Sequence, residues 1–562
     1  MNIIGLSCYF HDAAACLVRD GRVVAAAEEE RFTRKKHDSG FPEHALRYCL
    51  KAGGLTGADL DGVIFYDKPL RKLERAMAAG YASDSCDELM RWHLRHLLHE
   101  DLLLTERVAA AIGYQGALSY CDHHLSHAAS CFYASPFTEC AVLTVDGVGE
   151  WATTAQFLGR DRDLTLVREI RYPHSIGLFY STLTGFLGFE VNEGEYKIMG
   201  LASYGQPRYV DRLEKLLIRH EDGSFQLDMS YFLFLSNRER MHSEALVALL
   251  GPPRGPGEAV TQYHMDIAAS LQSVTEQAMV GLVRSFRSFT DVPTLAMAGG
   301  VAHNVVANAV IRTETDFTHI FVQPASGDSG GAIGAALYLY YRQNERGAGR
   351  TLARYGTCLG PAYGDDEITP VLDEHGLSYR RLDEAALVAR TAALLHKDLV
   401  VGWFQGRMEF GPRALGCRSI LANPCNPKMK DILNARVKFR EEFRPFAPAV
   451  LEDRAREYFD LPEASPFMLF TANVIKGKEA EIPAVTHVDG TARVQTVSRD
   501  DNPRFYRLIE EFAKLSQVPV VVNTSFNIRG EPIVCTPRDA VNCFLYTDID
   551  FLVIGDYLVS KS

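Results

Sequence analysis

The strongest constraint on the fold is a pattern of strands that occurs twice. Three apolar runs, broken by a small-residue loop and the turn Asp20-Gly21, lie at 3–7, 13–18 and 23–27. An Asp-Gly pair between apolar runs is a strong hairpin signal. The same order returns, with the loop Asp146-Gly147-Val148-Gly149 after the first run, at 141–145, 153–158 and 164–170. The repetition predicts two related α/β halves with mixed sheets around a cleft.

A chain of 562 residues exceeds the size of a single hydrophobic core, so we expect more than one domain. Composition shifts at 343–354, and we predict domains at 1–348 and 349–562, the second with its own strands and helices. Helices are expected at 69–110 and 263–289. Residues 208–242 are irregular and largely polar, and the sequence assigns them no role.

Charge and cysteine usage exclude several classes of protein. The net charge of −12 disfavours a general nucleic-acid binder, because an acidic chain repels phosphate backbones. We expect a cytoplasmic protein without a membrane partner, since no signal-peptide pattern and no apolar run of membrane-spanning length is present. The 12 cysteines include no Cys-x-x-Cys pair and are interpreted as reduced thiols.

A histidine pair is the sharpest motif of the first half. His123 and His127 are four residues apart, so they share one face of a helix that Asp122 could cap. Imidazoles at this spacing can chelate one divalent metal. The alternative is two unrelated surface or core histidines.

Two aspartates strengthen the metal hypothesis. Asp146 and Asp328 each follow an apolar strand, and ligands of α/β proteins gather at the carboxyl ends of strands. Two histidines with two carboxylates suit Fe(II), Mn(II) or Zn(II). The alternative is that each aspartate caps the next element or serves a turn.

Two further loops carry weaker signals. His11, in the first loop, mirrors Asp146 and could act as a general base on a hydroxyl, or make only a loop hydrogen bond. Gly299-Gly300-Val301 stands between a strand and a helix, where glycines let the backbone approach a nucleotide. Tight packing is the commoner reason for such glycines.

The second domain holds a basic segment, residues 407–444, with few acidic neighbours. In an acidic chain this predicts a cradle for a phosphate-bearing ligand, because arginine offers paired donors to phosphate oxygens. Arg413 lies in the rigid turn 411–416, which argues against the alternative of a solvated, ion-paired face. The polar segment 523–527 follows a strand and could bind phosphate or ribose, or satisfy its own backbone as a turn.

Taken together, these motifs resemble those of the NodU/CmcH/TobZ family of O-carbamoyltransferases over nearly the whole chain. The similarity rests on the segments Phe10-His11-Asp12-Ala13-Ala14, Glu28-Glu29-Glu30-Arg31-Phe32, Lys35-Lys36-His37, His123-His124-Leu125-Ser126-His127-Ala128-Ala129, Lys197-Ile198-Met199-Gly200-Leu201-Ala202, Ala298-Gly299-Gly300-Val301, Gly411-Pro412-Arg413-Ala414-Leu415-Gly416, Phe443-Arg444-Pro445-Phe446-Ala447-Pro448 and Asn523-Thr524-Ser525-Phe526-Asn527.

The resemblance implies an α/β fold with an N-terminal actin-like domain, a duplicated ribonuclease-H-like unit of the ASKHA type, and a C-terminal YrdC-like α/β domain. It implies that the C-terminal domain converts carbamoyl phosphate and ATP to carbamoyl-adenylate, with Mg²⁺ as a partner of ATP. The N-terminal domain then transfers the carbamoyl group to an alcohol with the help of Fe(II), or another divalent metal, and releases AMP.

The resemblance also implies residue roles. His123, His127, Asp146 and Asp328 would hold the metal, His11 would be the base, and Lys36 would be a basic residue near the first-domain active site. In the N-terminal domain, nucleotide and carbamoyl-adenylate would be bound by Gly299, Gly300, Val301 and Asn304. In the C-terminal domain, carbamoyl phosphate and ATP would be bound by Arg413, Arg418, Lys438, Arg444, Asn523 and Ser525.

The expected acceptor is a small-molecule natural product, as in antibiotic biosynthesis, and not a nucleic acid; a homodimer is compatible with the sequence. The acceptor itself stays open among aminoglycosides, macrolides, β-lactam precursors, alkaloids and lipo-oligosaccharides. Three alternatives also stay open: a tRNA-modifying threonylcarbamoyl transferase, a kinase of the actin-like superfamily, and a nucleotide-dependent scaffold.

Overall fold

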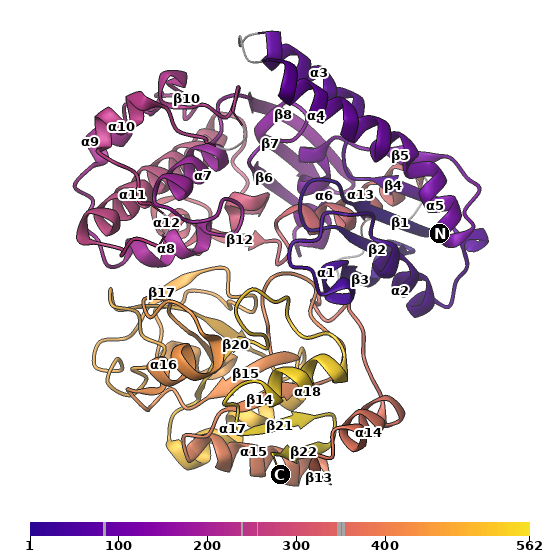
Figure 1. Cartoon of the computed structure of the whole chain (residues 1–562), viewed down its shortest axis with the longest axis vertical. Coiled ribbons are helices and arrows are strands. Elements are labelled where there is room, and N and C mark those ends of the chain that lie inside the picture. The colour runs from indigo at the N-terminus through magenta and orange to yellow at the C-terminus, as the bar shows by residue number, and fades with distance from the viewer. Residues whose placement is uncertain (82–85, 238–239, 256, 345–349, 351–354, 562) are drawn as a thin grey trace. The chain divides into compact units, whose positions relative to one another are not determined.

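The chain divides into two compact units, shown in a computed structural model that describes residues 1–81, 86–237, 240–255, 257–344, 350 and 355–561 (Figure 1). Unit 1 comprises 1–29 and 38–355, and unit 2 comprises 30–37 and 356–562. The predicted boundary after 348 lies outside the described residues, and the units divide after Tyr355. The grouping of 30–37 with unit 2 was not predicted.

The first sheet of unit 1 has the order β3-β2-β1-β4-β5. Its strands are β1 (Asn2–Ser7), β2 (Ala14–Arg19), β3 (Arg22–Glu28), β4 (Gly62–Phe65) and β5 (Leu118–Tyr120). The first three strands pair antiparallel, whereas β4 and β5 are parallel to β1.

The second sheet repeats this topology strand for strand, in the order β8-β7-β6-β11-β12. Its strands are β6 (Glu139–Val145), β7 (Ala152–Arg160), β8 (Asp163–Arg171), β11 (Thr294–Ala298) and β12 (His319–Val322). An antiparallel meander is again followed by two parallel strands. The predicted duplication and the mixed sheets are therefore confirmed.

Two buried helices link the sheets of unit 1. Helix α13 (Asp328–Gln343) packs on the first sheet, α6 (His123–Ala134) packs on the second, and the two helices pack against each other. Their close approach needs a small residue, because a Cβ at Gly334 would lie 1.7 Å from the Ser126 carbonyl oxygen. The contact fixes the start of α13 relative to α6.

The remaining helices of unit 1 surround this core. They are α2 (Glu43–Gly53), α3 (Pro69–Tyr81), α4 (Cys86–His99), α5 (Leu104–Ile112), α7 (Ile176–Phe186), α8 (Glu195–Ala202), α9 (Val210–Leu213), α10 (Glu244–Leu250), α11 (Gln262–Ser285) and α12 (Val305–Glu314). The predicted helical regions correspond to α3–α5 and to α11. Within the polar segment 208–242, β9 (Leu217–Arg219) and β10 (Phe225–Leu227) form a short hairpin.

Unit 2 is built on one mixed sheet of order β13-β22-β21-β14-β15-β20-β16-β19. The strands are β13 (Ser378–Arg381), β14 (Val401–Phe404), β15 (Arg418–Ala422), β16 (Ala447–Leu451), β19 (Gln495–Val497), β20 (Val520–Ser525), β21 (Phe551–Ile554) and β22 (Tyr557–Ser560). A separate hairpin is formed by β17 (Thr471–Asn473) and β18 (Thr491–Arg493). The α/β class predicted for the second domain is confirmed.

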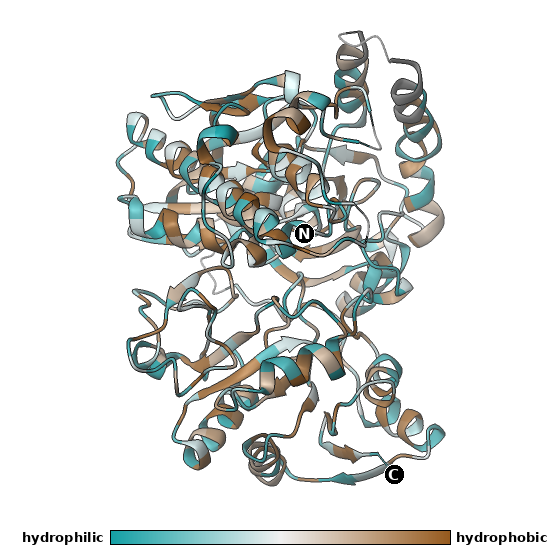
Figure 2. Cartoon of the chain, turned by 60° about the vertical axis from the view of Figure 1, so that its left-hand side comes forward, coloured by the Kyte–Doolittle hydropathy of each residue, from teal (hydrophilic) through white to brown (hydrophobic). Residues whose placement is uncertain are grey.

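Apolar residues are buried on both faces of the sheet of unit 2. The helices of this unit are α1 (Glu30–Thr33), α14 (Asp365–Glu374), α15 (Glu384–His396), α16 (Met429–Ile432), α17 (Pro503–Ser516) and α18 (Pro537–Leu545). Successive residues of β14 alternate between two cores, with Trp403 in one and Phe404 in the other, as the period of a strand requires. In Figure 2, brown dominates several strands of this unit, whereas its helices carry both teal and brown residues.

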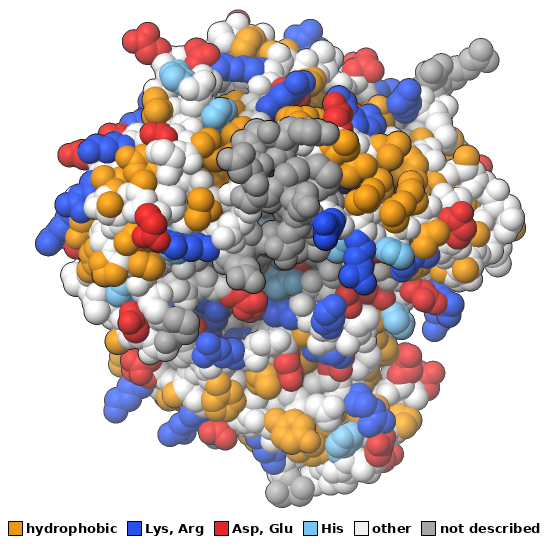
Figure 3. All heavy atoms as spheres, turned by 45° about the horizontal axis from the view of Figure 1, so that its top comes forward, with side chains coloured by type: hydrophobic (Ala, Val, Ile, Leu, Met, Phe, Trp, Pro, Cys, Tyr) orange, Lys and Arg blue, Asp and Glu red, His pale blue; other side chains and the backbone are white. Residues whose placement is uncertain are grey.

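The surface carries charges of both signs. On the face shown in Figure 3, acidic and basic side chains are interspersed, and neither covers a wide area. Among the described residues, no helix is both long enough and apolar enough to cross a membrane.

Candidate functional site

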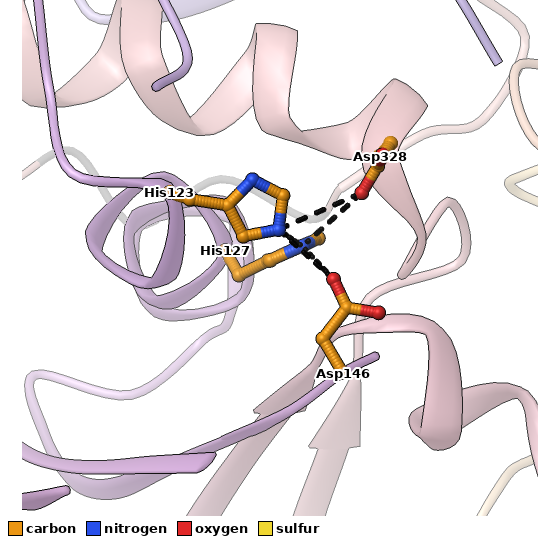
Figure 4. Close-up of side chains that lie close together, drawn as sticks. All are labelled: His123, His127, Asp146 and Asp328. Carbon is orange, nitrogen blue, oxygen red and sulfur yellow. Dashed lines mark hydrogen bonds and ion pairs between the residues drawn. The ribbon is translucent and has the colours of Figure 1, made fainter. Parts of the chain in front are cut away.

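Four predicted side chains converge in unit 1 (Figure 4). His123 and His127 project from α6, Asp146 follows β6, and Asp328 opens α13. The two Nε2 atoms are 3.1 Å apart and lie 2.9 and 3.1 Å from Asp146 Oδ2. Asp328 Oδ1 lies 3.7 and 3.6 Å from the same nitrogens. We call these four residues the His/Asp cluster.

The donor set of the His/Asp cluster fits a divalent metal ion. Metal–nitrogen and metal–oxygen bonds of about 2.0–2.2 Å place neighbouring donors about 3–3.5 Å apart, close to the observed spacings. All four donor atoms lie within 4.8 Å of one another. Two imidazoles and two carboxylates are ligands that Fe(II), Mn(II) and Zn(II) accept.

Hydrogen bonds to Asp146 through Nε2 and packing of the rings together orient the two imidazoles. The Nδ1 atoms of His123 and His127 have no hydrogen-bond partner among the described residues. The His123 ring packs against the Tyr66 ring with centroids 5.2 Å apart, and both histidines are buried. Tyr66 also donates its hydroxyl proton to Asp328 Oδ2 at 3.4 Å, so one residue touches two members of the cluster.

The start of α6 differs from the prediction. Asp122 occupies the N-cap position, but its side chain makes no capping bond and instead pairs with Lys68 Nζ at 2.7 Å. Glu150 takes over this function, because its carboxylate accepts the backbone N–H of His123 at 3.0 and 3.1 Å. The expected cap was therefore wrong, since a partner distant in sequence satisfies the helix terminus.

Opposite charges balance within the His/Asp cluster. Burial alone would raise the pKa of Asp146, but hydrogen bonds to His123 and His127 hold it well below its usual range. Burial alone would lower the pKa of His127, yet Asp146 and Asp328 raise it to about 9. The neighbouring His124 instead bonds Thr144 Oγ1 at 2.7 Å, and burial lowers its pKa to about 3.

His11 lies in the first loop of unit 1, where the negative charges of Asp146 and Asp328 also act on it. Its Nδ1 lies 2.8 Å from Asp12 Oδ2, and its side chain is 23% exposed. Burial would lower its pKa, but the hydrogen bond and charge of Asp12, followed by the charges of Asp328 and Asp146, raise it to about 9. This position agrees with the predicted role near the cluster, and the role as base stays a prediction.

Gly299 and Gly300 pack directly against the Asp146 loop. Gly299 has φ +95°, and a Cβ there would lie 2.2 Å from the Val145 carbonyl oxygen. The Gly300 N–H donates to Asp146 Oδ1 at 3.1 Å, which orients that carboxylate. Close packing therefore accounts for both glycines, and nucleotide binding by this loop stays a prediction.

The rest of this loop leads into α12. Val301 lies in a short 3-10 turn (Gly300–His303). Asn304 caps α12 by accepting the Ala307 N–H at 3.0 Å, and its amide exchanges two hydrogen bonds of 3.0 Å with Gln272. The amide of Asn304 thus has structural partners within unit 1.

In unit 2, Lys438 and Ser525 come together as predicted. Lys438 closes a π-helical turn (Leu433–Lys438), a distortion that often marks functional sites. Its buried Nζ donates to the carbonyl oxygens of Ser525 (2.8 Å) and Asn527 (2.9 Å), and to Ser525 Oγ (3.1 Å) and Asn527 Oδ1 (2.6 Å). None of these partners is a carboxylate. Burial, together with the charges of Arg440, Arg444 and Lys36, holds its pKa well below the usual value.

An arginine missed by the sequence analysis joins this group. Arg493 ends β18, and burial lowers its pKa well below the usual range, assisted by the charges of Arg413, Arg440 and Arg444. No local pattern marks Arg493, because a hairpin far along the chain brings it to the basic segment. We call Arg413, Lys438, Arg440, Arg444 and Arg493 the basic cluster.

Arg418 has a different environment from the one expected. It is fully buried, and its guanidinium donates to the carbonyl oxygens of Gln405 (2.9 Å) and Pro361 (3.1 Å). It also stacks on Phe404, 3.6 Å from the ring centroid. These contacts assign Arg418 a structural function, which corrects the expectation of direct ligand binding.

Asn523 supports the turn that carries Arg413. Its buried Nδ2 donates to Gln495 Oε1 at 2.7 Å and to the Ala414 carbonyl oxygen at 3.2 Å. Its Oδ1 has no hydrogen-bond partner among the described residues. Lys36, predicted beside the first-domain site, is half-buried and groups with unit 2, where its charge acts on Lys438.

A cavity of about 70 Å³ adjoins the His/Asp cluster within unit 1. Aromatic and apolar walls are combined with charged residues, and the lining comprises Tyr9, Phe10, Tyr66, Pro69, Lys72, Leu73, Arg75, His96, Leu97, Asp101, His123, Val148 and Gly149. Helices α3 and α4 supply much of this lining. We call it the α3/α4 cavity.

Comparisons with known proteins agree with the two-part organisation. The family model described as "Carbamoyltransferase N-terminus" matches residues 2–337, and "Carbamoyltransferase C-terminus" matches 392–561. An uncharacterized Synechocystis protein, sll1178, is 44% identical over 100% of this chain and 97% of its own length. The nodulation protein NolNO of Sinorhizobium fredii is 38% identical over 98% of this chain and 79% of its own length.

Two more distant proteins complete these comparisons. The uncharacterized protein MJ1058 of Methanocaldococcus jannaschii is 33% identical, with 100% of both chains covered. Among solved structures, the match to HypF of T. kodakarensis covers 61% of this chain and 48% of the HypF chain. The sequence identity is 15% and the TM-score is 0.32. Both family models and the full-length relatives establish that the chain belongs to the carbamoyltransferase family and is a carbamoyltransferase enzyme.

Proposed function

We propose that this enzyme is an ATP-dependent O-carbamoyltransferase with one half-reaction in each unit. Unit 2 would convert carbamoyl phosphate, water and ATP to carbamoyl-adenylate, phosphate and pyrophosphate, with carbamate formed first and then attached to the α-phosphate of ATP. Unit 1 would transfer the carbamoyl group to a hydroxyl of a small-molecule natural product and release AMP. The observation that carries this proposal is the segregation of a His/Asp cluster in unit 1 from a basic cluster in unit 2.

The basic cluster has the character of an anion site. Arg493 is half-buried, the charges of three other arginines act on it, and the direct partners of Lys438 carry no charge. Phosphate oxygens would relieve this repulsion, because guanidinium groups bind them through paired, charge-assisted hydrogen bonds. The cluster would hold phosphoryl groups while the carbamoyl group becomes attached to the nucleotide.

In unit 1, His123, His127, Asp146 and Asp328 would hold a divalent metal, with Fe(II) as the ion that the family resemblance favours. When bound, such an ion polarises a carbonyl oxygen on which negative charge develops. The Gly300 N–H keeps Asp146 in position. His11, once deprotonated, would take the proton of the acceptor hydroxyl, and Asp12, 2.8 Å from Nδ1, would stabilise the imidazolium that forms.

The α3/α4 cavity is the proposed entrance for the acceptor, because His123 belongs both to its lining and to the His/Asp cluster. Its aromatic and aliphatic walls would exclude water from an activated carbamoyl group. Lys72, held by the buried Asp67, adds a fixed positive charge to the lining. The net charge of −12 favours a small molecule over tRNA as the acceptor.

Product analysis tests the proposed first half-reaction. The purified protein is incubated with ATP, Mg²⁺ and carbamoyl phosphate, and the nucleotide and phosphate products are separated. We expect pyrophosphate and carbamoyl-adenylate to form only when carbamoyl phosphate is present. ADP as the product would identify a kinase instead, and tight, salt-sensitive binding of tRNA would favour the tRNA-modifying alternative.

A pair of leucine variants on α3 tests the proposed acceptor route. Leu73 lines the α3/α4 cavity, whereas Leu70 is 67% exposed on the same helix and does not line it. Leu73→Trp should block acceptor carbamoylation and leave pyrophosphate formation intact, and the matched Leu70→Trp should change neither. Equal acceptor carbamoylation by both variants would exclude this cavity as the route.

A further inference from the structure

Two cysteines of unit 2 lie in direct contact beside the turn that carries Arg413. Cys358 Sγ and Cys417 Sγ are 3.3 Å apart. A disulfide needs a sulfur separation of about 2.05 Å, so an approach of about 1.3 Å would allow the bond to form. Cys358 is partly exposed, whereas Cys417 is 6% exposed. A small disulfide can therefore reach Cys358, and the buried Cys417 can then react with the modified Cys358.

The backbone around the pair is tied to the turn 411–416. Cys358 forms a β-bridge with Glu409, whose carboxylate accepts the N–H groups of Leu415 and Cys417, each at 2.7 Å. The turn ends at Gly416, where φ is +104° and a Cβ would lie 2.4 Å from the Phe505 ring. A shift of Cys417 would therefore also move the turn 411–416, because Gly416 is packed closely against Phe505 and cannot absorb the displacement.

We propose that Cys358 and Cys417 form a reversible disulfide that displaces the turn 411–416 and switches off anion binding by Arg413. The oxidant would be a low-molecular-weight disulfide. The regulatory half of this inference rests on the proposed function of unit 2, whereas formation of the bond does not.

The chemistry proceeds by two thiol–disulfide exchanges. The Cys358 sulfur, as thiolate, attacks the small disulfide, whose S–S bond breaks to release one thiol and leave a mixed disulfide. Cys417 sulfur then attacks the Cys358 sulfur and expels the second small thiol. Two protein S–H groups and one small disulfide become one protein disulfide and two small thiols. The order follows from exposure, and from the raised pKa of Cys417, caused by its hydrogen bond to Cys358 and by burial.

The first experiment uses the full chain and oxidised glutathione as the probe. After equilibration with defined ratios of oxidised to reduced glutathione, free thiols are counted and non-reduced peptides are mapped by mass spectrometry. We expect the loss of two thiols, a mass decrease of about 2 Da and a cross-linked 358–417 peptide. Cys425→Ser, which alters a half-buried cysteine outside the pair, should behave like the wild type, and Cys358→Ser should give no cross-link.

The second measurement is pyrophosphate formation with carbamoyl phosphate and ATP. Oxidised wild type and Cys425→Ser should lose most of this activity and regain it with a dithiol reductant, whereas Cys358→Ser should keep it under oxidation. Absence of the cross-link, or a cross-link that leaves the activity unchanged, would overturn the inference. If the reduced protein makes no pyrophosphate, the proposed function fails, while the peptide map still decides whether the disulfide forms.

Discussion

The two candidate sites hold their charges in opposite ways. In unit 1, buried histidines and carboxylates face one another, so each stabilises the charge of its neighbours. In unit 2, the buried Lys438 and the half-buried Arg493 lie near further arginines, and the hydrogen-bond acceptors of Lys438 are oxygens without formal charge. The first arrangement contains charges of both signs, whereas the second is mainly cationic, with Glu441 Oε2 3.6 Å from Arg444 Nη1 as an acidic neighbour. The contrast supports the proposal that unit 1 binds a cation and unit 2 binds a phosphate group.

The largest expected effect comes from removing a member of the His/Asp cluster. His123→Ala deletes one of four converging donors, so we expect loss of the bound metal and a fall of about 10³-fold in acceptor carbamoylation. Carbamoyl-phosphate-dependent pyrophosphate formation should continue, because the basic cluster is untouched. Metal content by elemental analysis and both half-reactions are measured on the same preparation.

The matched control for this variant is the adjacent histidine. His124 bonds Thr144 through Nδ1 and does not belong to the cluster, and an asparagine can place an amide where that nitrogen lies. His124→Asn should therefore retain metal. If His123→Ala stopped pyrophosphate formation as well, the division of labour between the units would be wrong.

The next effect concerns the basic cluster. Arg413→Ala should reduce carbamoyl-phosphate-dependent ATP consumption about 10²-fold, because one fixed donor for a phosphoryl oxygen is lost. Metal binding by unit 1 should be unchanged. Arg436, exposed in the same basic segment, provides the control, and Arg436→Ala should consume ATP at the wild-type rate. Wild-type consumption by Arg413→Ala would remove this residue from the phosphate site.

Local patterns explain which parts of unit 1 were predictable. The hairpins follow from turn residues between apolar runs, and the repeated order of runs revealed the duplication before any pairing was known. His123 and His127 share a helix face because of their spacing. Each of these inferences uses residues a few positions apart, where backbone geometry fixes the outcome.

Long-range contacts explain what the sequence could not show. Segment 30–37 groups with unit 2 because Arg31 donates to the Gly411 carbonyl oxygen at 3.1 Å, and Arg34 to those of Pro532 and Ile533, each at 2.8 Å. Nothing near these arginines in the chain signals such partners. Burial is equally non-local, which is why the sequence did not show that Arg418 is fully buried or that Arg493 joins the basic cluster.

A smaller effect tests whether the basic cluster costs stability without an anion. Arg493→Met removes a half-buried positive charge on which three other arginines act, so the ligand-free protein should gain about 1 kcal/mol of stability. The same variant should lose much of the rise in thermal midpoint that pyrophosphate gives the wild type. Calorimetry with and without pyrophosphate measures both. A variant that is destabilised without ligand, yet still stabilised by pyrophosphate, would contradict the repulsion argument.

The smallest expected effect is a pH dependence that belongs to unit 2 alone. Burial and the charges of Arg440 and Arg444 lower the pKa of Lys438 in the folded chain. At any pH between this lowered pKa and the usual 10.5, the unfolded chain therefore binds more protons than the folded chain. Stability must then rise with pH across this interval. Relative to Lys438→Met, the wild type should gain thermal stability from neutral towards alkaline pH, and the exposed Lys428→Met should follow the wild type. If thermal stability changed with pH in the same way for the wild type and Lys438→Met, the neighbouring charges would not lower the pKa of Lys438. The electrostatic contrast between the two sites would then be wrong.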